Sequence, residues 1–422
     1  MSLKALLTIS LLAGLMVLFV ACGGAESAPA NTVEAPPTLE VANLVDTAEP
    51  TAVPATATAT ATLPPPPTVP PPPAATLIPT STPVPGVKLL TAEDFGDVYN
   101  PLTGEEMEDP ELLQRRPIAV KISNSPPSYV RPQSGLNEAD IVFEHITEAV
   151  ATRFTAVFFG KTPENIGPIR SARLIDVELL AMYDAALGYS GSGIGVGQRL
   201  FAADFRNRIM RSNTPGYYRT GDTSKPSEHT LYADPEQLWE ALEERELNDP
   251  PNYNQTRMTF TTEVPENGTP AQQIDIDYKY ETVSWQYDPE TNLYYRIAAD
   301  EPHMDANTEE QLQTRNVVVV FANHENDADI CEQVSADNIC QLLSVEIQLW
   351  GQGNAIVFRD GQRFDGVWKR EDRKDMLTFY NIDGNPIPLQ VGNTWVEIMS
   401  TYYRDPIAVY EEIPDADASE DS

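Results

Sequence analysis

The sequence predicts an α/β domain followed by a β-rich domain, α+β overall, preceded by a signal peptide and a disordered Pro/Thr-rich linker. Three observations support this. A basic start and a long apolar run open the chain, and a segment without apolar periodicity follows. Apolar strand-like runs then alternate with helical patterns between residues 87 and 254. Short alternating runs separated by turn residues fill residues 255–412.

The first 21 residues are predicted to be a lipoprotein signal peptide. Lys4 gives a basic start, and residues 5–21 are almost wholly apolar. This run is short for a membrane-spanning anchor, and no cluster of positive charge follows it. The letters LFVAC resemble a bacterial lipobox, with Phe19 where leucine is usual, so Cys22 is expected to carry lipid. We therefore expect a protein anchored to the cell membrane by acylated Cys22, on its extracytoplasmic face.

Residues 22–86 are predicted to be a disordered spacer. They consist largely of Ala, Thr, Pro, Val and Glu, and no apolar pattern in them is able to build a core. Proline-rich chain favours extended geometry of about 3.1 Å per residue, which would lift a folded domain away from the membrane. At the other end, the acidic residues 413–422 are predicted to be a disordered tail.

The predicted α/β domain covers residues 87–254. Its elements are strands at 116–124, 141–146 and 154–159, a helix at 171–185, a strand, glycine-rich turn and helix between 185 and 209, and a helix at 235–246. The first helix follows from apolar residues three and four apart, such as Leu174 and Val177. The four alternating glycines of 191–197 do not form a dinucleotide or P-loop motif. They indicate either an anion-binding turn or a tight crossover.

The predicted β-rich domain covers residues 255–412. The run at 316–323 is continuously apolar, which is typical of a central strand buried on both faces. Hairpin turns are expected at 288–292 and at Asp360–Gly361. Four tryptophans fall on predicted strands and are expected to fill the core, with an exposed sugar-stacking row as the alternative: Trp285, Trp350, Trp368 and Trp395.

Two cysteines remain after Cys22, namely Cys331 and Cys340. Outside the cytoplasm an even number of cysteines indicates a disulfide, here one that closes a short loop. The alternative, a two-cysteine metal site, has only His324 nearby as a further ligand. His303 and Asp305 resemble half of a metal site without a third ligand at a fixed spacing. We expect neither a metal nor a cofactor.

The charge balance narrows the classes of partner. The chain has 63 acidic and 28 basic residues, a formal charge of −35. A field of this sign repels phosphate backbones, so nucleic-acid binding is not expected. The expected partners are membrane lipid through Cys22 and either an anionic cell-wall component or another envelope protein.

Several segments together resemble the YerB family of bacterial lipoproteins. They are RPIAVKISN, IGPIRSAR, EHTLYAD, PHMDANTEEQL and GQGNAIVFRDGQRFDGVWKRE, in this order. In that family the extracytoplasmic region is divided into two domains of unknown function, and the resemblance implies a membrane-tethered surface protein with the same two parts. Residues 149–151 depart from the family, because alanines and valine replace a glycine-bearing turn.

The candidate site is a cluster of arginines in a chain that has few basic residues. It consists of Arg131, Arg153, Arg170 and Arg173. Guanidinium groups bind carboxylate or phosphate through paired hydrogen bonds, so these residues are predicted to form an anion site for a wall component. The alternative is structural: Glu144 and Glu148 would neutralise the arginines and lock the sheet to the helix.

An enzymatic alternative uses His229 with Glu144 or Glu148 as an acid–base pair of a cell-wall hydrolase or transferase. The sequence has no G-x-S-x-G or H-E-x-x-H motif that would specify such chemistry. A purely structural envelope partner would instead expose an apolar patch. We therefore favour a non-enzymatic cell-envelope binding or accessory protein, and leave the enzyme as the alternative.

Overall fold

The structure is a computed structural model that describes residues 89–96 and 98–414. The predicted signal peptide (1–21), Cys22, the spacer (22–86) and most of the acidic tail lie outside these residues. Among the described residues, no helix combines the length and apolar character needed to cross a membrane.

The described part consists mainly of strands, with four α-helices and several 3₁₀ turns. The helices are α1 Pro127–Val130, α2 Ile175–Met182, α3 Ile194–Ala202 and α4 Pro235–Glu243. The 3₁₀ turns are η1 Pro110–Gln114, η2 Leu136–Glu138, η3 Glu148–Val150, η4 Arg206–Arg208 and η5 Ser227–His229. The strands are β1 Ile118–Ser123, β2 Ile141–Ile146, β3 Thr152–Phe158, β4 Ala186–Gly188, β5 Ile209–Met210, β6 Tyr217–Arg219, β7 Leu231–Ala233, β8 Thr269–Pro270, β9 Gln273–Asp277, β10 Thr282–Asp288, β11 Leu293–Ala298, β12 Glu301–Pro302, β13 Gln313–Thr314, β14 Asn316–Val334, β15 Cys340–Gln348, β16 Gly351–Arg359, β17 Gln362–Arg370, β18 Thr378–Tyr380, β19 Thr394–Ser400 and β20 Ile407–Tyr410.

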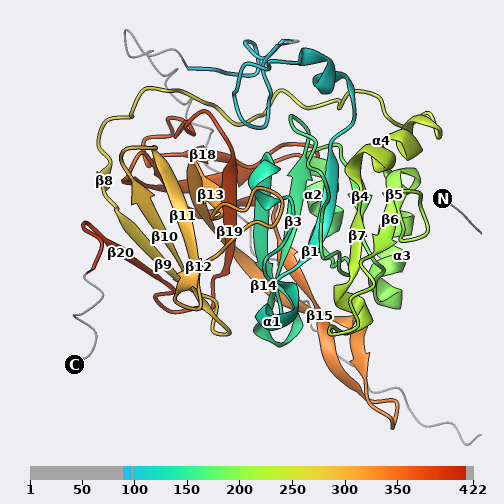
Figure 1. Cartoon of the computed structure of the whole chain (residues 1–422). Helices are drawn as coiled ribbons and strands as arrows, with labels where there is room; N and C mark the ends of the chain where they lie inside the picture. The colour runs from blue at the N-terminus through green and yellow to red at the C-terminus, as the bar shows by residue number, and fades with distance from the viewer. Residues whose placement is uncertain (1–88, 97, 415–422) are drawn as a thin grey trace, which may run out of the picture. The chain divides into compact units, whose positions relative to one another are not determined.

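One large sheet joins the two halves of the sequence (Figure 1). Its order is β18-β17-β16-β14-β19-β2-β3-β1-β4-β5, with β15 and β8 added at β14 and β17. The join is the parallel pair β2 and β19, in which Glu144 lies opposite Glu397. Strands of both predicted domains therefore share one hydrogen-bonded sheet, and a second sheet, β12-β11-β10-β9-β20, comes from the β-rich half alone.

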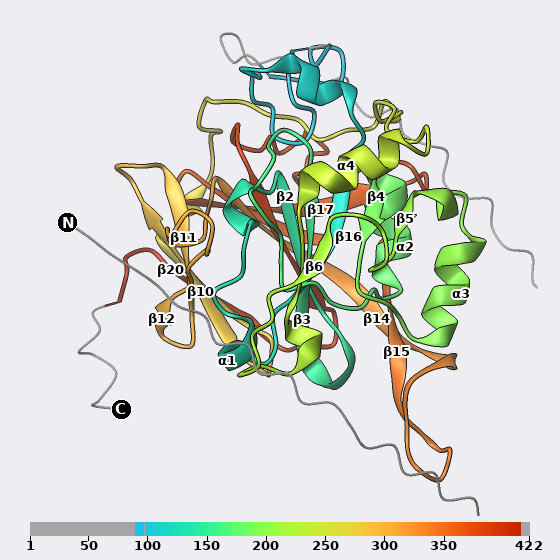
Figure 2. The same ribbon diagram turned by 45° about the vertical axis from the view of Figure 1, so that its right-hand side comes forward.

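The large sheet is buried on both faces. Leu179 of α2 and Leu200 of α3 belong to the apolar core on one face. Trp285 of the second sheet and Leu238 of α4 belong to the core on the other face. Figure 2 shows α2 and α3 beside the large sheet. Burial on both faces explains why the central strands are almost continuously apolar rather than alternating.

The predicted strands at 141–146 and 316–323 are confirmed. β2 spans Ile141–Ile146 and is buried throughout. β14 begins at Asn316 between β16 and β19, and its first residues are buried on both faces. The helix predicted at 171–185 is shorter, because the buried Asp176 carboxylate accepts the backbone N–H of Arg173 at 2.7 Å. That bond holds the preceding residues outside the helix, which starts at Ile175.

β14 continues far beyond the predicted strand and forms a projecting hairpin with β15 (Figures 1 and 2). This hairpin, residues 323–348, is called here the arm. The predicted disulfide is present in the arm, where Cys331 and Cys340 are joined by an S–S bond of 2.07 Å. The glycine-rich turn packs against the arm: a Cβ on Gly195 would lie 2.6 Å from the Ile330 side chain. The close approach of α3 to the arm explains this glycine, which favours the crossover interpretation.

Three of the four tryptophans fill the core as predicted. Trp285, Trp368 and Trp395 are buried. The prediction was wrong for Trp350, which is 49% exposed. Trp350 lies in the turn between β15 and β16, outside the hydrogen-bonded ladder that would have placed its side chain in a core.

The turn between β2 and β3 holds two residues in the left-handed region, Ala149 (φ 61°) and Val150 (φ 58°). A β-branched side chain there costs roughly 1–2 kcal/mol, and glycine removes that cost while losing part of the gain to unfolded-state entropy. We expect Val150→Gly to raise the free energy of unfolding by about 1 kcal/mol, measured by urea denaturation. Ala151→Gly, at φ −69°, is the matched control and should lower it. Equal losses in both variants would contradict the strained turn.

Candidate functional site

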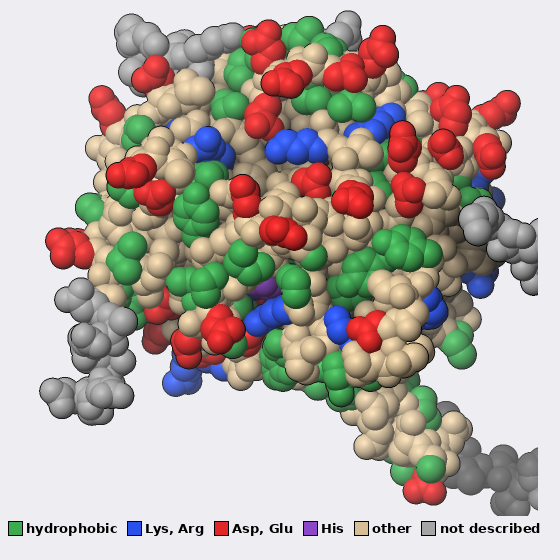
Figure 3. Space-filling model, in the orientation of Figure 1, with side chains coloured by type: hydrophobic (Ala, Val, Ile, Leu, Met, Phe, Trp, Pro, Cys, Tyr) green, Lys and Arg blue, Asp and Glu red, His purple; other side chains and the backbone are tan. Residues whose placement is uncertain are grey.

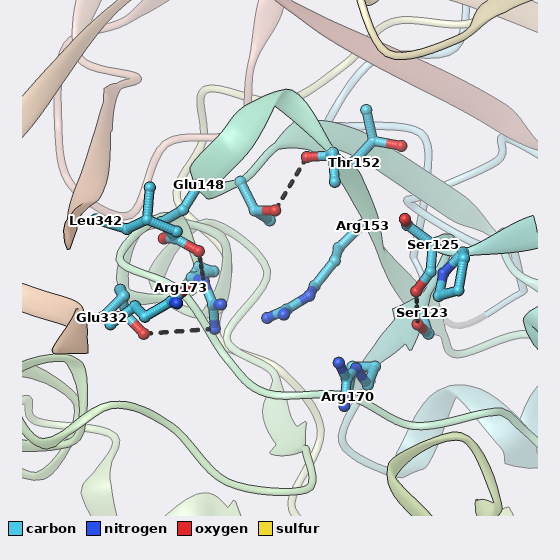
Figure 4. Close-up of a pocket in the computed structure, with 13 residues that line it drawn as sticks. Ser123, Ser125, Glu148, Thr152, Arg153, Arg170, Arg173, Glu332 and Leu342 are labelled. Carbon is cyan, nitrogen blue, oxygen red and sulfur yellow. Dashed lines mark hydrogen bonds and ion pairs between the residues drawn. The ribbon is translucent and has the colours of Figure 1, made fainter. Parts of the chain in front are cut away.

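A pocket of about 320 Å³ lies where β1 and β2 end and β3 begins, beside the disulfide-linked part of the arm (Figure 4). It is lined by Ser123, Ser125, Pro126, Thr147, Glu148, Ala151, Thr152, Arg153, Arg170, Arg173, Glu332, Gln333 and Leu342. Three of the four arginines of the predicted cluster are among them. The three strand ends, the segment before α2 and the arm each contribute side chains.

The register of the sheet places these side chains together. Arg153, near the start of β3, lies opposite Ser123 at the end of β1. Arg170 is fixed by its backbone, whose N–H donates to the carbonyl of Lys121 at 2.9 Å. In Figure 4 the side chain of Arg153 extends into the middle of the pocket, with Arg173 on one side and Arg170 on the other.

The positive charges of the three arginines are neutralised to different extents. Arg173 donates to Glu148 at 2.7 Å and lies 3.9 Å from Glu332. Arg153 donates to the carbonyl of Ser171 at 2.7 Å and forms no ion pair with a described residue. Arg170 makes neither a side-chain hydrogen bond nor an ion pair within the described part of the chain, although Glu228 acts on it from a longer distance. The Arg153–Arg170 side of the pocket is therefore its more positive side.

The titration behaviour follows from this crowding. Burial, together with the charges of Arg173 and Arg170, lowers the pKa of Arg153 to about 9. Burial also lowers the pKa of Arg170, and Glu228 opposes this effect more than Arg173 adds to it. With this pKa, the guanidinium of Arg153 still carries its positive charge at neutral pH. Three mutually repelling cations are thus held together, an arrangement that a bound anion would relieve.

A buried polar network lies beneath the pocket. The ammonium of Lys121 contacts His145 Nε2 at 2.7 Å, Thr155 Oγ1 at 2.8 Å and Asp176 Oδ1 at 2.8 Å. Desolvation lowers the pKa of Lys121 to about 8, and Asp176 opposes that shift. Since Asp176 also holds the backbone of Arg173, this network positions the arginine segment. Sequence reasoning missed it, although a lysine inside an otherwise apolar strand was an available signal.

Arg131 does not join the other three arginines. Its guanidinium forms a two-pronged pair with Glu281, with 2.8 Å between Nη1 and Oε1, and also donates to Asn124 at 3.2 Å. It is therefore neutralised by a residue of the β-rich half and is not among the residues that line the pocket.

Glu144 also lies away from the pocket. It is buried between the two sheets, where its Oε2 accepts from Arg296 at 2.5 Å and its Oε1 accepts from Thr152 at 2.7 Å. The sequence-based structural alternative expected it to neutralise the arginine cluster. Its partner is instead Arg296, which the sequence analysis did not single out.

His229 does not line the arginine pocket that Glu148 lines. His229 is buried, and its ring lies 5.5 Å from that of Tyr129. Burial and the charge of Arg170 lower the pKa of His229. Glu148 lines the arginine pocket but is held by Arg173. The arginine pocket therefore brings three cations together, but it does not bring His229 together with Glu148 as an acid–base pair.

His303 and Asp305 have structural partners. His303 Nε2 lies 2.7 Å from Gln133 Oε1, and Asp305 accepts the backbone N–H of Leu136 at 2.6 Å. These bonds connect the two halves of the sequence. Among the described residues, no group of three or more His, Cys, Asp or Glu side chains is arranged to hold a metal ion.

Acidic side chains are frequent on one face of the described structure (Figure 3). Figure 3 shows carboxylates spread over the upper part of one face, with only a few basic side chains among them. This agrees with the excess of acidic residues in the sequence. A pocket lined by three arginines and two glutamates therefore differs from the acidic balance of the whole chain.

Comparison with known proteins shows which protein family the chain is related to. Residues 102–248 match the "Protein of unknown function (DUF3048) N-terminal domain", and residues 274–396 match the corresponding C-terminal domain. The chain is 28% identical over 305 residues to the "Putative lipoprotein YerB" of Bacillus subtilis, covering 71% of this chain and 85% of that protein. The crystal structure of the Bacillus subtilis YerB protein is similar with a TM-score of 0.59 and 26% identity, over 74% of this chain and 99% of that one. The chain belongs to the YerB-like family with its two domains of unknown function.

Proposed function

We propose that this chain is a lipid-anchored, extracytoplasmic binding or accessory protein of the cell envelope, and that its arginine pocket holds an anionic group. The observation that carries the proposal is the unequal compensation of the arginines. The side chain of Arg170 has neither a hydrogen-bonding nor an ion-pairing partner among the described residues, and the side chain of Arg153 binds only a backbone carbonyl. Arginines that served only to lock the fold would each be paired.

The size and the lining of the pocket support binding of a small charged group. A volume of about 320 Å³ is at the lower end of the range for small-molecule sites. Figure 4 places Ser123 on the same side of the pocket as Arg170. The hydroxyl of Ser123 donates to the carbonyl of Ser125 at 3.2 Å, and the hydroxyl of Ser125 donates to Tyr280 at 3.2 Å, so the guanidinium groups are the donors left for an anion. Phosphate or carboxylate oxygens match guanidinium groups.

The anchoring part of the proposal depends on the N-terminus. The lipobox-like LFVAC sequence predicts acylation of Cys22, and the Bacillus subtilis relative carries the name of a lipoprotein. An acyl chain would hold the domain at the membrane without a spanning helix. The anion would then be a component of the envelope that reaches the outer surface of the membrane.

Calorimetric titration of the full chain with inorganic phosphate, at constant ionic strength, tests the pocket. We expect the wild type to bind, and Arg170→Gln to bind at least about tenfold more weakly, because a charge-assisted hydrogen bond contributes about 1.5–3 kcal/mol. Arg131→Gln is the matched control, since Arg131 lies outside the pocket, and it should bind as the wild type does. No binding by the wild type, or equal losses in both variants, would contradict the proposal.

A further inference from the structure

We infer that the ligand of the arginine pocket is an amphiphile, a single anionic head group on an aliphatic chain, and that the chain lies in a second hollow beside the pocket. This inference rests on the proposed function and deepens it. The head would be a phosphate monoester or a carboxylate held by Arg153 and Arg170, and the chain would run beneath the arm.

The second hollow is larger than the first and adjoins it. Its volume is about 460 Å³, and three residues line both hollows, namely Thr147, Glu148 and Leu342. Figure 4 places Glu148 and Leu342 on the side of the arginine pocket away from Arg170. A molecule bound at Arg170 and extending past Leu342 would therefore enter the second hollow.

The walls of the second hollow are mainly apolar. Val150 from the β2–β3 turn, Leu343 and Val345 from β15, and Tyr402 after β19 contribute to them. Val150 is 40% exposed and Tyr402 is 67% exposed. An exposed apolar surface beside a charged pocket fits a ligand that has one charged end and one apolar end.

The strained turn is an independent observation at the same place. Val150 has a positive φ of 58°, where glycine would be less costly. The strain places a branched apolar side chain on the wall of the hollow, where glycine would leave none. Backbone strain that persists against its cost is concentrated at ligand sites.

The charges indicate which end of the ligand goes where. Glu148, at the junction of the hollows, is already paired with Arg173 at 2.7 Å, so an uncharged chain passes it without leaving a new charge unpaired. In the second hollow, polar groups come mainly from amide, hydroxyl and imidazole side chains, such as Asn326, Ser400 and His324. An anionic end in this hollow would lack the guanidinium groups that are available in the first.

The test is a calorimetric titration of the full chain with inorganic phosphate and with butyl, hexyl and octyl phosphate, below their micelle concentrations and at constant ionic strength. We expect affinity to rise by roughly three- to fourfold for each methylene that is buried. Octanoate, titrated in parallel, distinguishes a carboxylate head from a phosphate head. Octyl glucoside, which has the chain without the charge, should bind at least tenfold more weakly than octyl phosphate.

Two variants separate the two hollows. Leu343→Asn should weaken octyl phosphate about tenfold and leave inorganic phosphate unchanged, whereas Arg170→Gln should weaken both. Val334→Asn is the matched control, because Val334 is 51% exposed near the tip of the arm, and it should change neither. If Leu343→Asn lowers the unfolding temperature, Val150→Asn replaces it.

The outcomes distinguish this inference from the function on which it rests. If inorganic phosphate binds and octyl phosphate binds no more tightly, the amphiphile is overturned and the anion site stands. If neither binds, both are overturned. If octyl glucoside binds as tightly as octyl phosphate, or Val334→Asn acts like Leu343→Asn, the assignment of head and chain to the two hollows is overturned.

Discussion

Replacement of Arg296 by methionine is expected to lower the free energy of unfolding by about 3–5 kcal/mol. Arg296 is fully buried between the two sheets, and its Nη2 donates to Glu144 at 2.5 Å. Glu397 lies opposite Glu144 in the parallel ladder and accepts from Trp285 at 2.7 Å. Without the guanidinium, Glu144 would remain buried beside Glu397 with no cation to pair with it. Urea denaturation at neutral pH measures the loss.

Two controls show whether this loss comes from the buried acidic pair, Glu144 and Glu397. Arg363→Met removes an exposed arginine paired with Asp365 and should cost less than about 1 kcal/mol. Adding Glu144→Gln and Glu397→Gln to Arg296→Met should recover part of the stability, because no unpaired charge remains. A loss for Arg296→Met no larger than that for Arg363→Met would contradict the buried network.

The same network makes stability depend on pH. Burial, and then the charge of Glu144, raises the pKa of Glu397 to about 8 from an ordinary value of 4.5. The folded state therefore holds a proton that the unfolded state has lost between these two values. Its contribution to stability is fully present below about pH 4.5 and is lost as the pH rises to about 8. Glu397→Gln should remove this slope relative to the wild type.

Replacement of Arg173 by glutamine is expected to cost about 3 kcal/mol, the second largest effect that we predict. The Arg173 and Glu148 side chains are only 10% and 5% exposed, and they form a 2.7 Å ion pair. Removing the cation would leave Glu148 buried without its partner. Urea denaturation at neutral pH measures the cost.

The double variant Arg173→Gln with Glu148→Gln serves as the control for this pair. It should lose less than the sum of the two single variants, because the residues are in contact. Additive losses would show that the pair is not coupled. Non-additive losses would instead assign Arg173 to the structural interpretation of the cluster and leave Arg170 to the binding interpretation, so that each sequence-based alternative describes a different arginine.

Local patterns in the sequence predicted most of the elements. The apolar run at 316–323 and the Asp360–Gly361 turn are found as a central strand and a hairpin. The disulfide followed from the number of cysteines remaining after Cys22, and it is present. These features depend on residues close together in the chain, and for that reason composition and spacing were sufficient.

The pairings between distant residues were not predictable in this way. Arg131 pairs with Glu281, and Glu144 pairs with Arg296, across separations of about 150 residues. No periodicity indicates that β2 and β19 lie side by side, yet that junction decides which charges meet. Glu332 of the arm likewise lines the arginine pocket although it is more than 150 residues from Arg173 in the sequence, and no local pattern indicates this. The sequence thus located three of the four arginines together and named one of their partners, Glu148, which pairs with Arg173.

The most direct measurement of the central claim compares the unfolding free energies of the wild type and Arg170→Gln in phosphate and in chloride at equal ionic strength. In chloride we expect Arg170→Gln to be at least as stable as the wild type, because it relieves repulsion among the arginines. At a phosphate concentration of about 100 times the dissociation constant, the wild type should gain about 2.7 kcal/mol and the variant much less, which reverses their order. A variant that is less stable in chloride and gains as much as the wild type in phosphate would show that Arg170 holds the fold and binds no anion.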